Sequence, residues 1–206
     1  MRAGKIIWLM AVSLIAVTTV HAQSQKLKLQ LNYGVATPTG SNFKDFISNT
    51  SFRGGGGSLL YSINDKISVG LSVSYQDFYQ KYPRQLYKTS DGSDLSAVVT
   101  NSLQTMPLLL QGQYNFLPKA TIQPYVALGI GGNLVTYRQF AGEFEDSRSK
   151  FGFAAKPEAG IQIPVGIMKS TAIVVGASYN YMPFNYNDIK NLNSVGVHAG
   201  VKFPLR

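Results

Sequence analysis

The sequence predicts an all-β fold, an eight-stranded antiparallel up-and-down transmembrane β-barrel. Apolar and polar residues alternate strictly in several segments, which is the period of a strand with two unlike faces. Short and long connections between these segments also alternate along the chain, as they do in membrane barrels. Glycine (20), tyrosine (12) and phenylalanine (11) are plentiful, while charged residues make up only 14%. This composition is unusual for a soluble exported domain.

The N-terminus has the features of a secretory signal peptide. Arg2 and Lys5 precede an apolar run over residues 6–20, and Ala22 closes a small-residue cleavage site. The apolar run is short for a membrane-spanning helix, which needs about 20 residues. We therefore expect residues 1–22 to be removed during export through the Sec pathway, and residues 23–206 to form one β-barrel domain.

The composition argues against several classes of function. The chain has no cysteine, so it holds no disulfide, thiolate metal site or cysteine nucleophile. The formal net charge is +9, and removal of Arg2 and Lys5 with the signal lowers it to +7 (17 basic against 10 acidic residues), which suggests an anionic partner. The basic residues are scattered rather than clustered, however, and export conflicts with a role in binding nucleic acid. After the signal, no stretch reaches 18 consecutive apolar residues, so no transmembrane helix is expected.

Eight segments carry the strand pattern. The clearest is residues 67–75, where five apolar residues alternate with serine and glycine without exception. Pro157 lies in the sixth segment and cannot donate to a ladder, so we expect a β-bulge there. The eight expected strands are residues 27–35, 55–63, 67–75, 105–116, 122–137, 151–163, 171–181 and 195–203.

The connections support the same topology. The tight ones are residues 64–65, 117–119 and 166–170. The long, polar ones are residues 36–53, 80–103, 138–150 and 182–193. Short periplasmic turns opposite long external loops are typical of a transmembrane barrel.

The two strand faces indicate which side meets lipid. The polar face consists mostly of Ser, Gly, Asn and Gln, which suits a narrow lumen filled by side chains better than a surface in water. The apolar face carries no charge, and an Arg or Lys at the bilayer midplane would cost about 2–4 kcal/mol. Aromatic residues gather at both strand ends, as interfacial belts do. A soluble lipocalin-like barrel, with its apolar face inward, is the alternative fold.

With its signal, eight alternating segments and a last strand that ends in Phe203 before Pro204, Leu205 and Arg206, the chain resembles the small outer-membrane β-barrel proteins of Gram-negative bacteria. It is similar to the OmpA transmembrane domain, OmpX and OmpW groups, and to the barrel family abundant in Bacteroidota. The resemblance implies location in the outer membrane, contact with outer-membrane lipid and lipopolysaccharide, and insertion by the barrel-assembly machinery. It carries no catalytic motif.

A few charged residues fall on the lumenal face: Lys28, Lys156, Glu158, His198 and Lys202. Buried charges need partners, and Glu158 is the acid we identify on this face. We therefore expect a structural network of ion pairs and amides centred on it. A membrane-rim hydrolase is the catalytic alternative, and it requires a Ser or a carboxylate within hydrogen-bonding reach of His198.

The predicted function is that of a non-enzymatic outer-membrane protein that displays four external loops for a structural or surface-binding role. We expect neither a cofactor nor a metal site. The hairpin over residues 80–103 is the longest, and its Tyr82, Arg84, Tyr87 and Lys88 are candidates for binding lipopolysaccharide phosphates, a partner protein or a surface ligand. Eight strands leave room only for side chains in the lumen. The alternative is a small barrel that passes or holds an apolar ligand, which a lateral opening or a hydrophobic lumen mouth would favour.

Overall fold

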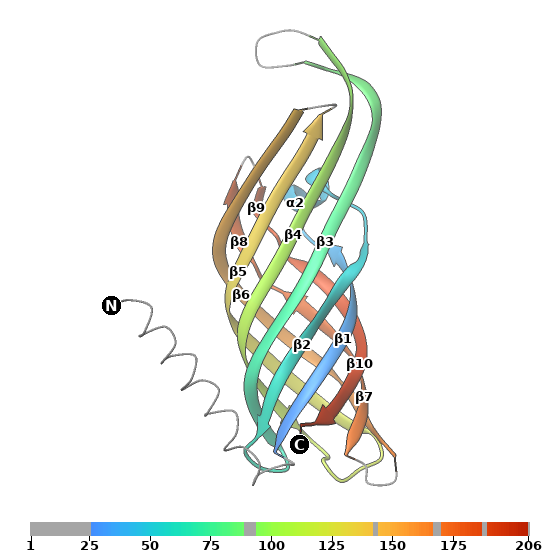
Figure 1. Ribbon diagram of the computed structural model, residues 1–206, viewed down its shortest axis with the longest axis vertical. Coiled ribbons are helices and arrows are strands. Elements are labelled where there is room, and N and C mark those ends of the chain that lie inside the picture. Colours follow the sequence, from blue (N-terminus) through green and yellow to red (C-terminus); the bar gives the residue numbers. More distant parts are fainter. Residues whose placement is uncertain (1–25, 89–93, 142–143, 167–169, 187–188, 206) are drawn as a thin grey trace, which may run out of the picture.

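The structure is a computed structural model, and it describes residues 26–88, 94–141, 144–166, 170–186 and 189–205. Eight strands close into an antiparallel barrel in the order β1-β10-β7-β6-β5-β4-β3-β2 (Figure 1). The predicted fold class is therefore confirmed. The predicted signal peptide, residues 1–22, lies outside the described residues.

Ten strands and one short helix make up the described secondary structure. The barrel strands are β1 (Leu27–Pro38), β2 (Ser51–Ser62), β3 (Ile67–Lys88), β4 (Asp94–Asn115), β5 (Gln123–Ala141), β6 (Phe144–Val165), β7 (Thr171–Asn180) and β10 (Ser194–Pro204). Helix α2 (Ser41–Phe46) lies between β1 and β2, and β8 (Pro183–Tyr186) pairs with β9 (Ile189–Asn191) as a separate ribbon. Within the described ranges, no helix is long and apolar enough to cross a membrane.

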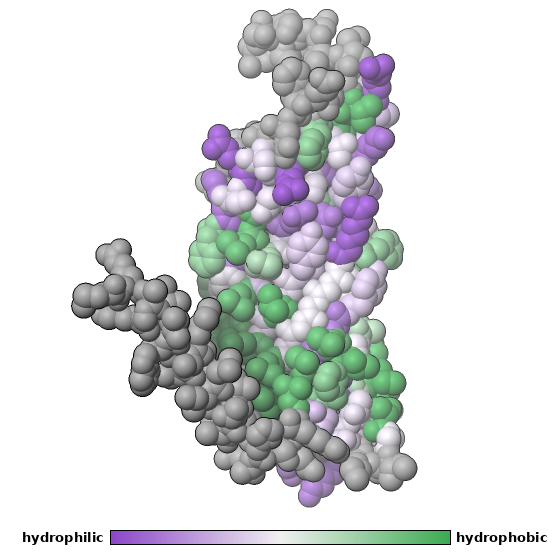
Figure 2. Space-filling model, viewed as in Figure 1, coloured by the Kyte–Doolittle hydropathy of each residue, from purple (hydrophilic) through white to green (hydrophobic). Residues whose placement is uncertain are grey.

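The apolar strand face points outward. Val69, Leu71 and Val73 are 41%, 51% and 45% exposed, whereas Ser68 and Ser72, which alternate with them, are buried in the lumen. On the face drawn in Figure 2, hydrophobic side chains gather on the part of the barrel near the short turns, with hydrophilic ones toward the end where β3 and β4 continue. The predicted orientation is confirmed, and the soluble barrel with its apolar face inward is excluded.

The prediction of long loops is wrong for two of the four connections, residues 80–103 and 138–150. Most of these residues belong to strands. β3 continues to Lys88 and β4 begins at Asp94, while β5 ends at Ala141 and β6 begins at Phe144. Both faces of a strand can be polar where it leaves the lipid, so the alternation that identifies strands in the bilayer is lost there. The four candidate loop residues, Tyr82, Arg84, Tyr87 and Lys88, accordingly lie on β3.

The continued strands form a sheet that rises past the closed ring (Figure 1). We call this sheet the extension; it comprises residues 77–88, 94–104, 136–141 and 144–149. The pairing of β2 with β3 stops at Gly54 and Gln76, and the continuous ladder between β6 and β7 stops at Glu158 and Ser178. The outer edges of β3 and β6 in the extension therefore have no paired strand within the described residues.

The expected bulge at Pro157 is also wrong. Glu158 pairs with Ser178, and after a gap Ala155 pairs with Tyr181 in the same register. Pro157 has no N–H to donate to the β6–β7 ladder. The register of the two strands is nevertheless the same on both sides of the proline, so neither strand has an extra residue there. Lys156 and Glu158 consequently keep the same inward face.

Candidate functional site: the filled lumen

The lumen has two layers with different chemistry. The layer near the short turns, which we call the polar layer, is built from alternate inward-facing residues of the strands. Its buried polar members are Gln30, Ser58, Ser68, Ser72, Gln111, Gln113, Asn115, Tyr125, Glu158, Gln162, His198 and Lys202, and a few apolar residues such as Leu60 and Val174 are buried among them. The layer toward the extension is apolar. Together the two layers fill the barrel, as expected for eight strands.

Glu158 is the centre of a buried charged cluster in the polar layer. Its Oε2 lies 3.2 Å from the Lys156 Nζ. Its Oε1 accepts a hydrogen bond of 2.8 Å from the Tyr125 hydroxyl and lies 3.3 Å from the His198 Nε2. The Tyr125 hydroxyl is also 3.3 Å from the same His198 nitrogen. A carboxylate that is buried this deeply is stable only when it is paired and hydrogen-bonded in this way.

Lys202 belongs to a second, separate cluster. Its Nζ donates to the Oε1 atoms of Gln113 at 3.1 Å and Gln162 at 3.4 Å. The Nε2 atoms of both glutamines donate in turn to the Asn115 Oδ1, at 2.7 and 3.3 Å. This cluster contains amides in place of a carboxylate, so the lysine charge is solvated by dipoles alone.

The structure thus brings three of the five predicted lumenal residues together, namely Lys156, Glu158 and His198. Lys202 bonds to glutamines instead, and Lys28 lies half-buried at the mouth of the barrel by the short turns. Tyr125, a further member of the Glu158 cluster, is not among the residues predicted from the sequence. Its signal was available, because Tyr125 alternates with the outward-facing Val126 and Leu128 and so had to point inward.

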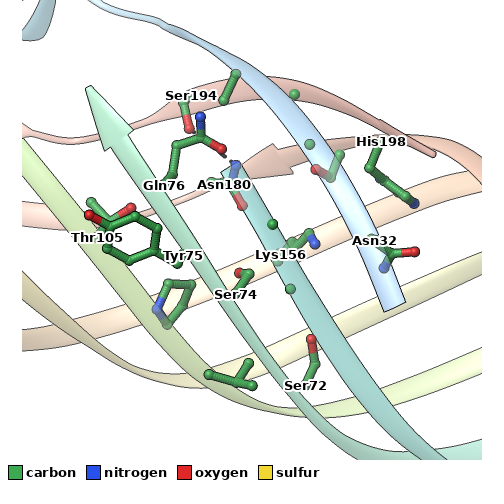
Figure 3. A pocket seen from close by; sticks show the side chains of 18 of the residues that line it. Asn32, Ser72, Ser74, Tyr75, Gln76, Thr105, Lys156, Asn180, Ser194 and His198 are labelled. Atoms are coloured by element: carbon green, nitrogen blue, oxygen red, sulfur yellow. Dashed lines mark hydrogen bonds between the residues drawn. The ribbon is translucent and has the colours of Figure 1, made fainter. Parts of the chain in front are cut away.

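A small cavity lies beside the Glu158 cluster. Its volume is about 60 Å³, which is room for a few water molecules and far less than the roughly 300 Å³ or more of a typical small-molecule site. Figure 3 shows its lining of hydroxyls, amides and charged groups. The labelled side chains are Asn32, Ser72, Ser74, Tyr75, Gln76, Thr105, Lys156, Asn180, Ser194 and His198.

The apolar layer closes the lumen above this cavity. It is formed by inward residues of the strands together with α2, the residue that follows it, and the segments around β8 and β9. Its buried members are Ala36, Phe43, Ile47, Phe78, Leu103, Leu109, Val135, Tyr137, Ala154, Met182 and Leu192. The polar lumen expected from the sequence is therefore correct only for the half near the short turns.

Helix α2 is anchored in the apolar layer by two aromatic contacts. Phe43 meets Phe78 edge to face with ring centroids 5.1 Å apart, and Phe46 stacks on Tyr137 at 5.1 Å. The helix and Ile47, which is fully buried, act as a plug in the mouth of the barrel.

Polar groups on the extension hold the end of the plug. The carbonyl oxygen of Phe46 accepts hydrogen bonds of 3.1 Å from the Tyr82 hydroxyl and from the Asn101 Nδ2. Tyr82, a predicted surface-binding residue, therefore contacts the plug. Arg84 is exposed, while the side chains of Tyr87 and Lys88 lie outside the described residues.

The lumen offers little for catalysis. The carboxylate required by the hydrolase alternative is present, because Glu158 lies 3.3 Å from His198. His198 is only 8% exposed, however, and it lies beneath the apolar layer, away from the rim. In the described part of the chain, no serine or threonine hydroxyl is hydrogen-bonded to it, and no three His, Asp or Glu residues are grouped to hold a metal ion.

Comparison with known proteins agrees with this architecture. A family model described as the outer membrane protein beta-barrel domain matches residues 7–203. Among solved structures, neisserial surface protein A (NspA) is 19% identical over 87% of this chain and 97% of its own, with a TM-score of 0.58. The outer membrane protein OprG from Pseudomonas aeruginosa is 13% identical over 89% of this chain and 97% of its own, with a TM-score of 0.49. No curated protein sequence matches the chain.

Proposed function

Because this chain belongs to the outer membrane protein β-barrel family and is a protein of the outer membrane, we propose that it is a non-conducting, non-enzymatic barrel that binds molecules at the cell surface through its extension. In this proposal the short turns face the periplasm and the extension faces outward. Lipopolysaccharide is the first expected contact, since its phosphates surround such a barrel.

One observation carries the proposal: the lumen is filled along its height while the sheet continues past it. In this proposal the polar layer and the plug block the passage of a solute, which their buried side chains support. The strands of the extension add nothing to closure of the ring, because their pairing continues beyond the last contacts of β2 with β3. Structure that neither closes the barrel nor conducts is best explained as a surface for binding.

The extension offers two kinds of contact. Lys81, Arg84, Arg138 and Arg148 are exposed on it, and such cations bind phosphate groups. The unpaired edges of β3 and β6 present backbone donors and acceptors to which an extended peptide can add as a strand. Both features support a surface-binding role over a purely structural one.

The proposal can be tested by shortening the hairpin between β3 and β4. Residues 83–98 are replaced by Asn-Gly, a two-residue hairpin turn, so that the paired residues Tyr82 and Val99 become its last pair. Tyr82 and Asn101 remain, and the plug keeps its hydrogen bonds. The shortened protein is expected to fold, as judged by heat-modifiable migration on gels, and to bind purified lipopolysaccharide more weakly than the parent in phosphatidylcholine nanodiscs.

A result of equal lipopolysaccharide binding by both proteins would contradict the proposed role of the extension. Single-channel recording in planar bilayers provides the second readout. The parent protein is expected to show no stable conductance, and an open channel of fixed conductance would contradict the filled lumen.

The second candidate function is binding of a small apolar ligand, and the apolar layer favours it. The hydrophobic lumen mouth is present, but the plug occupies it, with Phe43 and Ile47 buried to 1% and 0% exposure. A ligand would have to displace α2. A fluorescent fatty acid that binds the parent protein, and binds more tightly when Phe43 is replaced by Ala, would support this function over the first.

A further inference from the structure

A second, wider cavity opens at the end of the barrel with the short turns. It has a volume of about 590 Å³, which is within the range of sites for small molecules. We call it the bowl. Four lysines line it, Lys26, Lys28, Lys119 and Lys202, and among its described lining residues Asp65 is the one acid. The bowl is therefore a concave and strongly basic site.

Lys202 is the most buried of the four lysines, with 3% exposure. An ammonium group has three donors, and two of them go to the glutamine oxygens described above. The third makes no hydrogen bond within the described residues. No carboxylate oxygen in this part of the chain lies within 4.0 Å of the Lys202 nitrogen, since Glu158 is committed to Lys156 and His198.

The residues around Lys202 hold its ammonium group at the bowl. Asn115 accepts the amide hydrogens of Gln113 and Gln162, so both glutamine oxygens turn toward the lysine. Lys28 lies close by on the same inward face, because Lys202 pairs with Gln30 and Pro204 pairs with Lys28 across β1 and β10. Two lysines thus face the bowl from neighbouring positions, and Asp65 is the one acid among its described lining residues.

We propose that the bowl binds a phosphate-bearing anion, with Lys202 at its floor and Lys28 on its wall. Phosphate suits the site because its oxygens accept several charge-assisted hydrogen bonds at once, and lysines supply them as point charges. The anion is either a free phosphate compound or the headgroup of an anionic phospholipid. The inference goes beyond the proposed function, since the bowl and the extension lie at opposite ends of the barrel.

The test uses protein expressed with its own N-terminus, purified from outer membranes in a zwitterionic detergent, and titrated with inorganic pyrophosphate by calorimetry at low ionic strength. One saturable site per chain is expected. Lys202→Met should weaken binding by at least about tenfold, because a charge-assisted hydrogen bond is lost. Lys66→Met is the matched control, since Lys66 is exposed on the neighbouring turn and does not line the bowl; its affinity should stay within about twofold.

Absence of saturable binding at millimolar pyrophosphate would overturn the proposal. So would an equal loss in the Lys66→Met and Lys202→Met proteins, because that result indicates general surface charge. If the Lys202→Met protein does not show the heat-modifiable band of a folded barrel, the double variant Lys28→Met/Lys119→Met is titrated in its place. Its affinity for pyrophosphate is expected to fall by the same factor.

The source of the anion is distinguished in nanodiscs. Pyrophosphate binding that persists in phosphatidylcholine discs but disappears in discs containing phosphatidylglycerol assigns the bowl to a lipid headgroup. Pyrophosphate binding that is equal in the two kinds of disc assigns the bowl to a free phosphate compound. Each result supports the site, and the proposed role of the extension is unaffected by either.

Discussion

Replacement of Phe43 by Ala tests whether α2 is a docked plug. Phe43 is 1% exposed and packs edge to face against Phe78. Full burial of a phenylalanine side chain contributes about 1.5–3 kcal/mol, and a T-shaped aromatic pair adds about 0.5–1.5 kcal/mol. Phe43→Ala should therefore favour release of the helix by at least about 2 kcal/mol, which is roughly a 30-fold increase in the open population.

Hydrogen exchange measured by mass spectrometry on peptides spanning residues 41–50 reports this opening. The Ile47 amide donates to the Phe43 carbonyl at 2.8 Å, so its exchange rate should rise in proportion to the open population. Phe52→Ala is the control, because Phe52 is 64% exposed on the outward face of β2; exchange in α2 should stay unchanged in that protein. Barrel strands such as β10 should remain protected in both.

Two outcomes would refute this reasoning. If exchange in α2 is already fast in the parent protein, the helix is not docked in the lumen. If Phe43→Ala raises exchange equally in α2 and in β10, the helix is part of the cooperative barrel and not a separable plug.

The remaining predictions concern the barrel itself. Glu158→Gln should lower the free energy of unfolding in urea by about 3–5 kcal/mol, because it leaves the ammonium group of Lys156 without its carboxylate inside the barrel. Asp77→Asn, at a partly exposed ion pair, should cost only about 0–1 kcal/mol. Tyr125→Phe should cost about 1–3 kcal/mol in the same titration, since the Glu158 carboxylate loses a buried donor. Gly70→Ala should lower the temperature at which the heat-modifiable gel band is lost, because its Cβ would lie 1.8 Å from a backbone oxygen of the neighbouring strand. Gly112→Ala has open space around the new methyl and should leave that temperature unchanged; an equal effect of the two glycine changes would contradict the packing.

The barrel could be predicted from the sequence because lipid imposes a strong rule on it. Outward positions such as Leu71 and Val73 must be apolar, so a two-residue period marks each strand within the bilayer. The rule ends where the lipid ends. The upper parts of β3 and β6, which include Lys81 and Arg148, carry polar residues on both faces and resemble loops, although their backbones are paired.

The candidate site was predictable only in part. The alternation places Glu158 and His198 in the lumen, but it does not give the height of each residue, which depends on the tilt and stagger of the strands. Lys202 and Glu158 share the lumen and still belong to different clusters for this reason. The plug was beyond prediction, because six helical residues in a long connection acquire their structure from the apolar walls that receive them.

The two layers of the lumen answer two different physical requirements. Within the closed ring, every strand edge is paired, and most inward polar side chains bond to one another, as the amides, hydroxyls and the Glu158 cluster do. Toward the extension the ring is open between β3 and β6, so inward side chains there would meet water. Apolar residues such as Phe78 and Leu103 are stable at that level only if another part of the chain covers them. Helix α2, in the connection between β1 and β2, covers them. This helix has only six residues and therefore few backbone hydrogen bonds of its own. The part of the protein that seals the lumen is therefore also the part expected to open first.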